Sequence, residues 1–388
     1  MAIGEKVSGS IESIAAGGAG ILRWQGKTVF IDYTAPGDMV SAVIEEETPS
    51  WARASLLKVQ EASPHRVESP CPYYQHCGGC TLQHISYETQ LVIKKQLLVD
   101  HFKRIGTIEE LPSINIIESE PYGYRNRMQF HRVMKPKSGQ SRVGLKERAS
   151  EAVIPIETCP IADPGIQEAL RQKNLVPPPS LDRFTIYSRE GILLQEGKQQ
   201  RGTVRLLGAP LIMDAGVFFQ SNGQVLERLL KAVRSVAEQA DTSLPAADLY
   251  CGVGTFAYVL QDLFPALDLM EENPKALNLA KQNIRNGSAR FFPTSDEHWA
   301  KQAVKKPKEH HYGFMVLDPP RQGLSPALRD FLAHAGPPLI AYVSCDPVTQ
   351  ARDCKDLVKA GYHLETLDLY DFYPQTAHME SLAVLRRV

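Results

Sequence analysis

The first sixty residues alternate short apolar runs with turn residues. Gly17-Gly18 and Pro36-Gly37 are among the breaks between the runs. The predicted strands are Lys6–Ile11, Gly20–Leu22, Thr28–Ile31, Met39–Ile44 and Arg53–Val59. Strands this short, separated by regular turns, are typical of small closed sheets. Residues 1–62 are therefore predicted to form a small β-barrel domain.

The pattern then changes to a helical period. Leu91, Leu97, Leu98 and Phe102 recur at helical spacing, so we expect a helix from residue 87 to about residue 105. The chain after residue 107 has a mixed, strand-rich pattern. Residues 63–210 are therefore predicted to form a central α+β domain.

From residue 224 onward, helical and strand patterns alternate. The predicted helices are Leu226–Ala240, Phe256–Leu263 and Ala276–Ile284, and the predicted strands are Ala246–Tyr250, Ala266–Met270, Gly313–Leu317, Leu339–Ser344 and Ser381–Leu385. Alternation of this kind builds a parallel sheet with helices on both faces. Residues 211–388 are therefore predicted to form a Rossmann-like α/β domain.

The composition is that of a globular protein, with 388 residues, 43% of them hydrophobic and 22% charged. No stretch approaches the roughly 18 uncharged apolar residues that a membrane helix requires, and the first ten residues contain no apolar signal core. We therefore expect a cytoplasmic monomer with no membrane partner.

The formal net charge of −1 averages segments of opposite sign. Residues 1–90 contain 6 basic and 10 acidic residues, residues 91–210 contain 19 and 13, and residues 211–388 contain 18 and 21. Most of the central excess comes from Arg125, Arg127, Arg132, Lys135, Lys137, Arg142, Lys146 and Arg148. Because aromatic residues interleave with them, we expect a surface that contacts phosphates and stacks on bases.

A glycine loop follows the first strand of the α/β region. Gly252 and Gly254 allow a tight turn at the start of the next helix, where a ligand can approach the backbone. About twenty residues later, Glu271 follows the second strand, at the place of the acidic residue that binds a ribose in doubly wound folds. The third glycine of the dinucleotide fingerprint is missing. The loop therefore favours an adenosine-type ligand over a dehydrogenase cofactor.

Two further strand ends carry candidate chemistry. Asp318 and the two prolines after it close one apolar strand, and Cys345 directly follows another. Both lie at the carboxyl edge of the predicted sheet, where ligands bind in such folds. The loop before the last strand ends in Glu380, a second candidate.

Together these segments resemble the RNA 5-methyluridine methyltransferase family over residues 214–388. The matching segments are Val217-Phe218-Phe219-Gln220-Ser221-Asn222, the glycine loop at 248–256, the Asp-Pro-Pro-Arg-Gln-Gly-Leu run at 318–324, the Ser-Cys-Asp-Pro run at 344–347 and residues 372–381. The resemblance implies a class I, S-adenosylmethionine-dependent methyltransferase domain. It further implies the following roles: nucleophile, Cys345; base, Glu380; cofactor contacts, Gln220, Tyr250, Glu271 and Asp318.

Methylation of uracil at carbon 5 requires such residues. Carbon 5 is a poor nucleophile, so a thiolate first adds to carbon 6 and turns the ring into an enolate. A carboxylate must then remove the proton from carbon 5 before the cysteine can leave. Phe218 or Phe219 could stack on a base that has been taken out of its helix.

Four of the seven cysteines are predicted to hold a metal group. Cys71, Cys77 and Cys80 have C-x5-C-x2-C spacing, and Cys159 lies far downstream. Such a set can bind zinc or an iron-sulfur cluster, and the spacing alone does not choose between them.

The short Cys-Gly-Gly-Cys turn and the Cys159-Pro160 pair resemble the [4Fe-4S] site in one branch of the family. That resemblance implies that all four cysteines are cluster ligands. Histidines at 76 and 84 are alternative ligands that would favour zinc.

The front segment resembles the TRAM domain, a barrel of the oligonucleotide/oligosaccharide-binding (OB) type that contacts RNA in this family. The matching residues are Ser8–Ile11, Gly17–Ile21 and Val29–Ile31. Because this barrel and the cluster are features of the ribosomal branch, the resemblance implies a uridine in 23S rRNA as substrate. The alternatives are a tRNA uridine, methylation of cytosine or protein, and an RNA-binding redox sensor on a degenerate methyltransferase fold.

Overall fold

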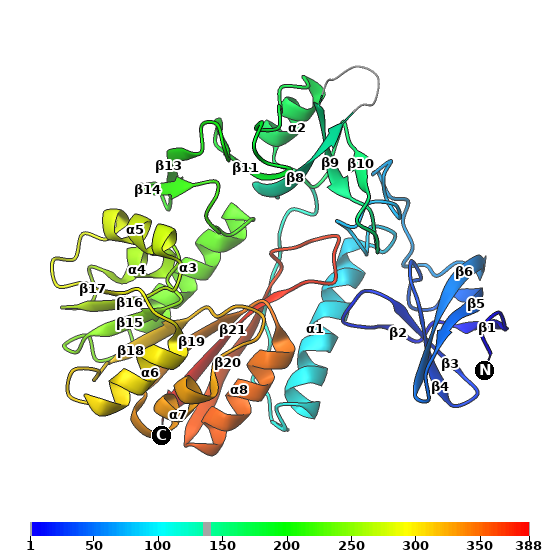
Figure 1. Cartoon of the computed structure of the whole chain (residues 1–388). Helices are drawn as coiled ribbons and strands as arrows, with labels where there is room; N and C mark the ends of the chain where they lie inside the picture. Colours follow the sequence, from blue (N-terminus) through cyan, green and yellow to red (C-terminus); the bar gives the residue numbers. More distant parts are fainter. Residues whose placement is uncertain (1, 135–140, 388) are drawn as a thin grey trace.

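A computed structural model describes residues 2–134 and 141–387 (Figure 1). The N-terminal module is a six-stranded sheet of order β1-β5-β6-β4-β3-β2. Its strands are β1 (Lys6–Ser10), β2 (Ser13–Ile14), β3 (Gly20–Trp24), β4 (Lys27–Ile31), β5 (Met39–Glu47) and β6 (Trp51–Glu61). Alternate residues of β5, Val40, Ala42 and Ile44, are buried in its core. The five predicted strands are confirmed, and β2 is an addition.

Helix α1 (Tyr87–Arg104) connects this module to the C-terminal sheet. The Ser86 hydroxyl begins the helix by accepting a hydrogen bond from the Thr89 amide (3.4 Å). After the helix, β7 (Ile116–Ile117) pairs in parallel with β20 (Tyr362–Tyr370). Residues 87–117 therefore join the C-terminal sheet, although the sequence pattern assigns them to the central domain.

The central region contains a five-stranded antiparallel sheet of order β10-β9-β8-β11-β12. Its strands are β8 (Arg127–Met134), β9 (Ser141–Lys146), β10 (Val153–Pro155), β11 (Arg183–Arg189) and β12 (Ile192–Gln195). Helix α2 (Pro164–Arg171) shares a core with this sheet. A separate hairpin, β13 (Arg201–Leu206) and β14 (Ala209–Asp214), then leads into the C-terminal region.

The C-terminal sheet has the order β17-β16-β15-β18-β19-β21-β20-β7. The remaining strands are β15 (Ala246–Leu249), β16 (Leu267–Met270), β17 (Arg290–Phe292), β18 (Phe314–Leu317), β19 (Leu339–Ser344) and β21 (Glu380–Arg387). The helices are α3 (Gly223–Ala237), α4 (Thr255–Leu260), α5 (Pro274–Asn283), α6 (Asp296–Lys305), α7 (Pro326–Ala335) and α8 (Pro347–Lys359). The strands β17, β16, β15, β18 and β19 pair in parallel. Strand β21 is antiparallel to both of its neighbours, β19 and β20.

Alternate strand residues bury themselves in two different cores. Phe314 and Val316 pack with residues of α3, α4 and α5, whereas Met315 and Leu317 pack with residues of α1, α6, α7 and α8. Successive side chains of a strand point to opposite faces, so both faces of the sheet are covered. The predicted Rossmann-like domain with helices on both faces is confirmed.

Capping residues fix the loops at the carboxyl edge of this sheet. Asn273, Ser325 and Asp346 cap α5, α7 and α8, and a proline follows each cap. The carboxylate of Asp346 accepts hydrogen bonds from the amides of Val348 and Thr349, both at 3.0 Å. The start of α8 therefore holds the turn that contains the preceding residue, Cys345.

No helix within residues 2–134 and 141–387 is both long and apolar enough to cross a bilayer.

Candidate active site

Neighbouring strand ends bring the predicted site residues to one edge of the sheet. Leu249 is aligned with Met270 and with Leu317, and Leu317 is aligned with Tyr342 of β19. The residues that follow β15, β16, β18 and β19 therefore share this edge: Tyr250, Glu271, Asp318 and Cys345.

Glu380 joins the same edge from an antiparallel strand. Ser344 pairs with Ser381 in the ladder between β19 and β21, so the next residues along, Cys345 and Glu380, face each other. The sequence pattern places Glu380 in a loop, but it is the first residue of β21 and is only 1% exposed. The two candidate catalytic groups are thus brought together from positions 35 residues apart.

Burial controls the ionisation of the groups at this edge. Burial, with the nearby carboxyls of Glu380 and Asp318, raises the pKa of the Cys345 thiol to about 12, and the Arg321 guanidinium opposes the shift. Burial, followed by Asp318, raises the pKa of Glu380 well above its usual value. A cation bound at this edge would favour the thiolate and the carboxylate.

The pKa of the Asp318 carboxyl is also raised. Burial raises the pKa of its carboxyl to about 7, and the hydrogen bond from Gln220 opposes that shift. Gln220 Nε2 donates to Asp318 Oδ2 at 3.4 Å, which links the segment before α3 to the end of β18.

Gln220 and Glu380 each have a buried oxygen atom at this edge for which the described residues supply no partner. Gln220 Oε1 and Glu380 Oε2 are inaccessible and accept no hydrogen bond from the described residues. An unpaired buried acceptor is costly, so such atoms are expected where a ligand supplies the donor.

The glycine loop has the backbone shape that its sequence predicts. Gly252 and Gly254 have positive φ values of 54° and 86°. Glu271 Oε2 accepts a hydrogen bond from the Gly252 amide (3.0 Å), and its Oε1 accepts one from the Asn273 amide (2.7 Å). The acidic residue after β16 therefore braces the loop after β15.

Tyr250 occupies this loop in an unexpected way. It has a positive φ of 66°, which is uncommon for a bulky residue. Its hydroxyl donates to Asp296 Oδ2 at 2.7 Å. The hydroxyl is thus engaged within the protein, and the role of Tyr250 in cofactor binding remains a prediction.

Asp248 is a buried carboxyl near this edge that sequence reasoning did not select as a candidate. Its Oδ2 accepts a hydrogen bond from the Ala257 amide (2.8 Å), whereas its buried Oδ1 has no partner among the described residues. Burial raises the pKa of this carboxyl to about 8. Its position two residues before Tyr250, at the end of a buried strand, was the available signal.

The two neighbouring phenylalanines before Gln220 have different environments. Phe218 is 61% exposed, and the Arg127 guanidinium lies 5.5 Å from its ring centroid. Phe219 is buried and packs edge-on against Tyr187. Only Phe218 is therefore available to stack on a base.

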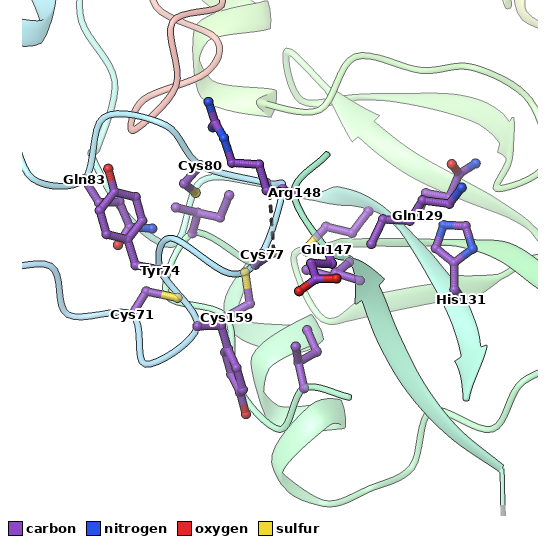
Figure 2. A pocket seen from close by; sticks show the side chains of 18 of the residues that line it. Cys71, Tyr74, Cys77, Cys80, Gln83, Gln129, His131, Glu147, Arg148 and Cys159 are labelled. Atoms are coloured by element: carbon purple, nitrogen blue, oxygen red, sulfur yellow. Dashed lines mark hydrogen bonds between the residues drawn. The ribbon is translucent and has the colours of Figure 1, made fainter. Parts of the chain in front are cut away.

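The four cysteines of the predicted metal site line one cavity, as Figure 2 shows. Cys71, Cys77 and Cys80 come from the loop before α1, and Cys159 comes from the segment between β10 and α2. The cavity has a volume of about 440 Å³, and none of the four thiols forms a disulfide. No three His, Cys, Asp or Glu side chains in the described part of the chain are grouped closely enough to hold a single metal ion. The cysteine cavity is confirmed as a grouping, and its cluster remains a prediction.

Charged side chains that line the cysteine cavity include Arg125, Lys146, Glu147 and Arg148. Burial raises the pKa of Cys80 to about 12 and that of Cys159 to about 11. Arg125, which lines the cavity, lowers the pKa of Cys77, Cys80 and Cys159.

The two histidines considered as alternative zinc ligands, His76 and His84, do not line the cysteine cavity. His84 Nδ1 lies 2.5 Å from the Tyr74 hydroxyl, and burial lowers the pKa of His84 to about 4.

Two side chains of the predicted basic surface have partners within the protein. Arg132 donates to the carbonyl oxygens of Pro178 and Leu181, and Lys146 pairs with Glu151. Arg132 is mostly buried, whereas Lys146 is 41% exposed in a surface ion pair, and phosphate contact by these residues remains a prediction. Lys135 and Lys137 lie outside the described residues.

Arg127 and Arg148 also have protein partners. Arg127 is largely buried beside Phe218, and its Nη2 donates to the Val217 carbonyl at 3.4 Å. Arg148 is 3.0 Å from Asp32 and lies over the Tyr33 ring, so it ties the N-terminal module to the mouth of the cysteine cavity. Sequence reasoning could not see these partners because they come from distant segments.

Comparison with known proteins matches this architecture. A family model described as tRNA (uracil-5-)-methyltransferase matches residues 212–388. An uncharacterized RNA methyltransferase of Aquifex aeolicus is 33% identical, with 97% of each chain covered. The chain belongs to the RNA uracil-C5 methyltransferase family.

Members of the family with more specific names are also similar. The 23S rRNA (uracil(1939)-C(5))-methyltransferase RlmD of Pseudomonas putida is 29% identical over 98% of this chain and 94% of its own. The structure of Pyrococcus abyssi tRNA (uracil-54, C5)-methyltransferase in complex with S-adenosyl-L-homocysteine has a TM-score of 0.75 and 24% identity, covering 98% of this chain and 100% of that one. The last comparison establishes the fold.

Family membership gives the activity of this protein in its general form. It is an S-adenosylmethionine-dependent enzyme that methylates uracil in RNA at carbon 5. The predicted fold class, cofactor and reaction are confirmed at this level.

Proposed function

We propose that this enzyme methylates a uridine of 23S rRNA through a covalent adduct between Cys345 and carbon 6 of the uracil. The observation that carries the proposal is the register of β19 and β21, in which Cys345 faces the buried carboxyl of Glu380. A nucleophile and a base within one edge are what the reaction at carbon 5 requires.

S-adenosylmethionine supplies a methyl group bound to a positively charged sulfur. The edge suits that charge, because carboxyls of Asp248, Glu271, Asp318 and Glu380 surround it. We propose that Gln220, Tyr250, Glu271 and Asp318 hold the cofactor there. The unpaired Gln220 Oε1 supports its part in this, since a ligand would supply the missing donor.

Cys345 begins the reaction on the base. Its thiolate attacks carbon 6, and the electrons of the carbon 5–carbon 6 double bond move toward the oxygen on carbon 4. Carbon 5 then takes the methyl group, while the electron pair of the broken methyl bond stays on the departing sulfur. A cationic donor and Arg321 favour the required thiolate, which burial alone opposes.

Glu380 completes the reaction. Its carboxylate takes the proton from carbon 5, the electrons of that bond re-form the double bond, and the Cys345 sulfur leaves carbon 6 as a thiolate. The raised pKa of Glu380 makes its carboxylate a stronger base than an exposed glutamate. Phe218, which is exposed beside this edge, is proposed to stack on the extruded uracil.

The cysteine cavity is proposed to hold a [4Fe-4S] cluster bound by Cys71, Cys77, Cys80 and Cys159. A single zinc ion would need all four sulfurs at about 2.3 Å from one point. A cavity of about 440 Å³ between the four cysteines instead suits a group larger than one ion, such as a cluster. Arg125 supports this assignment because it offsets the negative charge of the thiolates. A cluster bound there would add iron-sulfur chemistry to a site that otherwise holds four protonated thiols.

The N-terminal six-stranded sheet is proposed to be an OB-type TRAM module that contacts the RNA. Ribosomal RNA is preferred as substrate because relatives named RlmD match nearly the whole chain. The tRNA alternative rests on the family description and on the named tRNA enzyme of similar fold.

The proposal is tested by methyl transfer to defined RNAs. Unmodified 23S rRNA and unmodified tRNA are each incubated with the enzyme and labelled S-adenosylmethionine, and digested nucleosides are identified by mass spectrometry. We expect 5-methyluridine in 23S rRNA only. Label in tRNA alone would replace the rRNA assignment, and label in cytidine would reject uracil as the base.

A further inference from the structure

The catalytic loop, residues 371–379 between β20 and β21, is held by residues that lie almost 300 positions earlier in the chain. The amides of Thr81 and Leu82 both donate to the Gln375 carbonyl at 3.0 Å. The Ala377 amide donates to Thr81 Oγ1 at 3.1 Å. In Figure 1 this red loop reaches from the C-terminal sheet toward α1 and the central region.

Helix α1 holds the same loop through side chains that are completely buried. Gln90 Nε2 donates to Gln375 Oε1 at 3.0 Å, and the Gln375 amide donates back to Gln90 Oε1 at 2.9 Å. Lys94 Nζ is 2.6 Å from Asp371 Oδ1 and 3.0 Å from the Tyr373 carbonyl. Gln375 has a positive φ of 67°, an uncommon conformation that these contacts stabilise.

The anchor is continuous with the cysteine cavity and with the N-terminal module. Thr81 directly follows Cys80, which lines the cavity. At Gly18, which has a positive φ, an added Cβ would lie 3.0 Å from Thr81 and 3.5 Å from Ala377. The turn of the N-terminal sheet that contains Gly18 therefore packs against both Thr81 and Ala377.

We infer that Thr81 and Gln90 are positioning residues that keep Glu380 opposite Cys345, and that an occupied cysteine cavity stabilises this arrangement through Cys80. The inference rests on the proposed roles of Cys345 and Glu380. Neither Thr81 nor Gln90 contacts the substrate in this scheme, and their effect reaches Glu380 through Gln375 and Ala377.

Such a role predicts a specific kinetic defect. Addition of Cys345 and methyl transfer precede the step at Glu380, so a displaced base slows only the release of the product. The methylated adduct should then accumulate. A residue with a merely structural role would lower the amount of folded enzyme without trapping an intermediate.

The test compares Thr81→Val and Gln90→Leu with controls on exposed parts of the same fold. Thr81→Val removes only the acceptor for the Ala377 amide, and Thr203→Val in β13 is its control. Gln90→Leu is matched by Gln96→Leu, because the Gln96 side chain is exposed on α1 and bonds only within the helix, to Asp100.

We expect Thr81→Val and Gln90→Leu to lower kcat about tenfold, since each leaves a buried polar group without its partner. KM for RNA should fall together with kcat, so that kcat/KM for RNA stays unchanged, because the slowed step follows methyl transfer. The affinity for S-adenosylmethionine should be unchanged, and a denaturant-resistant protein-RNA band should appear. Glu380→Gln serves as the reference for that band. If Glu380→Gln traps RNA but neither variant does, the positioning role is rejected; if Glu380→Gln also fails, the proposed mechanism is at fault.

Hydrogen exchange of the purified holoenzyme tests the link to the cysteine cavity without reference to activity. In Cys80→Ser, the amides of Thr81, Leu82, Gln375 and Ala377 should exchange at least tenfold faster, while those of β15 and β18 stay protected. Unchanged exchange in the loop would reject the link. If Thr81→Val does not fold, the exchange experiment and Gln90→Leu still decide the outcome.

Discussion

Cys345 and the four cysteines of the cavity are all thiols whose pKa burial raises, but different groups surround them. Cys345 faces two carboxyls and Arg321 at an open edge of the sheet. The cavity thiols face one another and Arg125, with Cys80 and Cys159 buried and Cys71 and Cys77 partly exposed. Burial therefore favours the protonated thiol at both places, and a cationic ligand at either place would favour the thiolate. The ligand proposed at the sheet edge is the cationic methyl donor, whereas the ligand proposed in the cavity is a resident cluster.

The largest expected effect is the loss of methyl transfer when Cys345 is removed. Cys345→Ala should lower methyl transfer by about 10⁴-fold or more, because no other group can add to carbon 6. Binding of S-adenosylmethionine, measured by calorimetry, should remain. Cys354→Ala, which removes a buried thiol from α8, is the control and should keep transfer within a few-fold of the wild-type rate. Normal turnover by Cys345→Ala would remove the distinction between the two thiol sites.

The next effect is a difference in stability between a variant in the cysteine cavity and one at the sheet edge. Cys159→Ala should lower the free energy of unfolding by about 2–4 kcal/mol, because it removes a buried group and a proposed ligand. Denaturant titration of the holoenzyme, with iron and sulfide analysis, measures both losses. Cys345→Ala should be close to the wild type in the same titration, and equal destabilisation of the two variants would contradict this.

A smaller effect concerns the charge beside Cys345. Arg321 lowers the pKa of this thiol, so Arg321→Gln should raise it further and reduce the thiolate at any given pH. The rise of kcat with pH should therefore move to higher pH, with a rate about three- to tenfold lower at pH 7.5. Arg321→Lys should restore most of the rate. A profile that does not move would show that Arg321 does not act on the thiol.

The smallest effect isolates burial in a carboxyl that lies at the sheet edge but has no proposed catalytic role. The pKa of Asp248 is raised to about 8 in the folded protein, so its contribution to stability is complete at low pH and is lost as the pH rises toward 8. Asp248→Asn keeps an acceptor for the Ala257 amide and cannot ionise. Its melting temperature relative to the wild type should therefore increase from pH 5 to pH 8, measured by calorimetry. A constant difference would contradict the raised pKa.

Local patterns were sufficient to predict the parts of the fold that repeat regular periods. The strands β15, β16, β18 and β19 are short apolar runs, and each ends close to its predicted residue. Strand β20 was not predicted. Its neighbours in the sheet are β21 and β7, and β7 lies some 250 residues earlier in the chain, so the local sequence does not reveal this pairing.

The same limit applies to the site. Cys345 and Asp318 could be found because each follows a recognisable strand. The Gln90–Gln375 pair could not, because a buried amide pair leaves no periodic trace in either segment. The carbonyl partners of Arg132 could not be predicted either, since they belong to the loop before β11.

Trapping of the adduct by Glu380→Gln tests the central claim most directly. The variant keeps the shape of the side chain but cannot take the proton from carbon 5, so the methylated base should remain attached to the enzyme. After incubation with S-adenosylmethionine and 23S rRNA, nuclease and protease digestion followed by mass spectrometry should identify a 5-methyluridine nucleotide on the peptide that contains Cys345. Free 5-methyluridine at the wild-type rate, or an adduct on any other cysteine, would contradict the account.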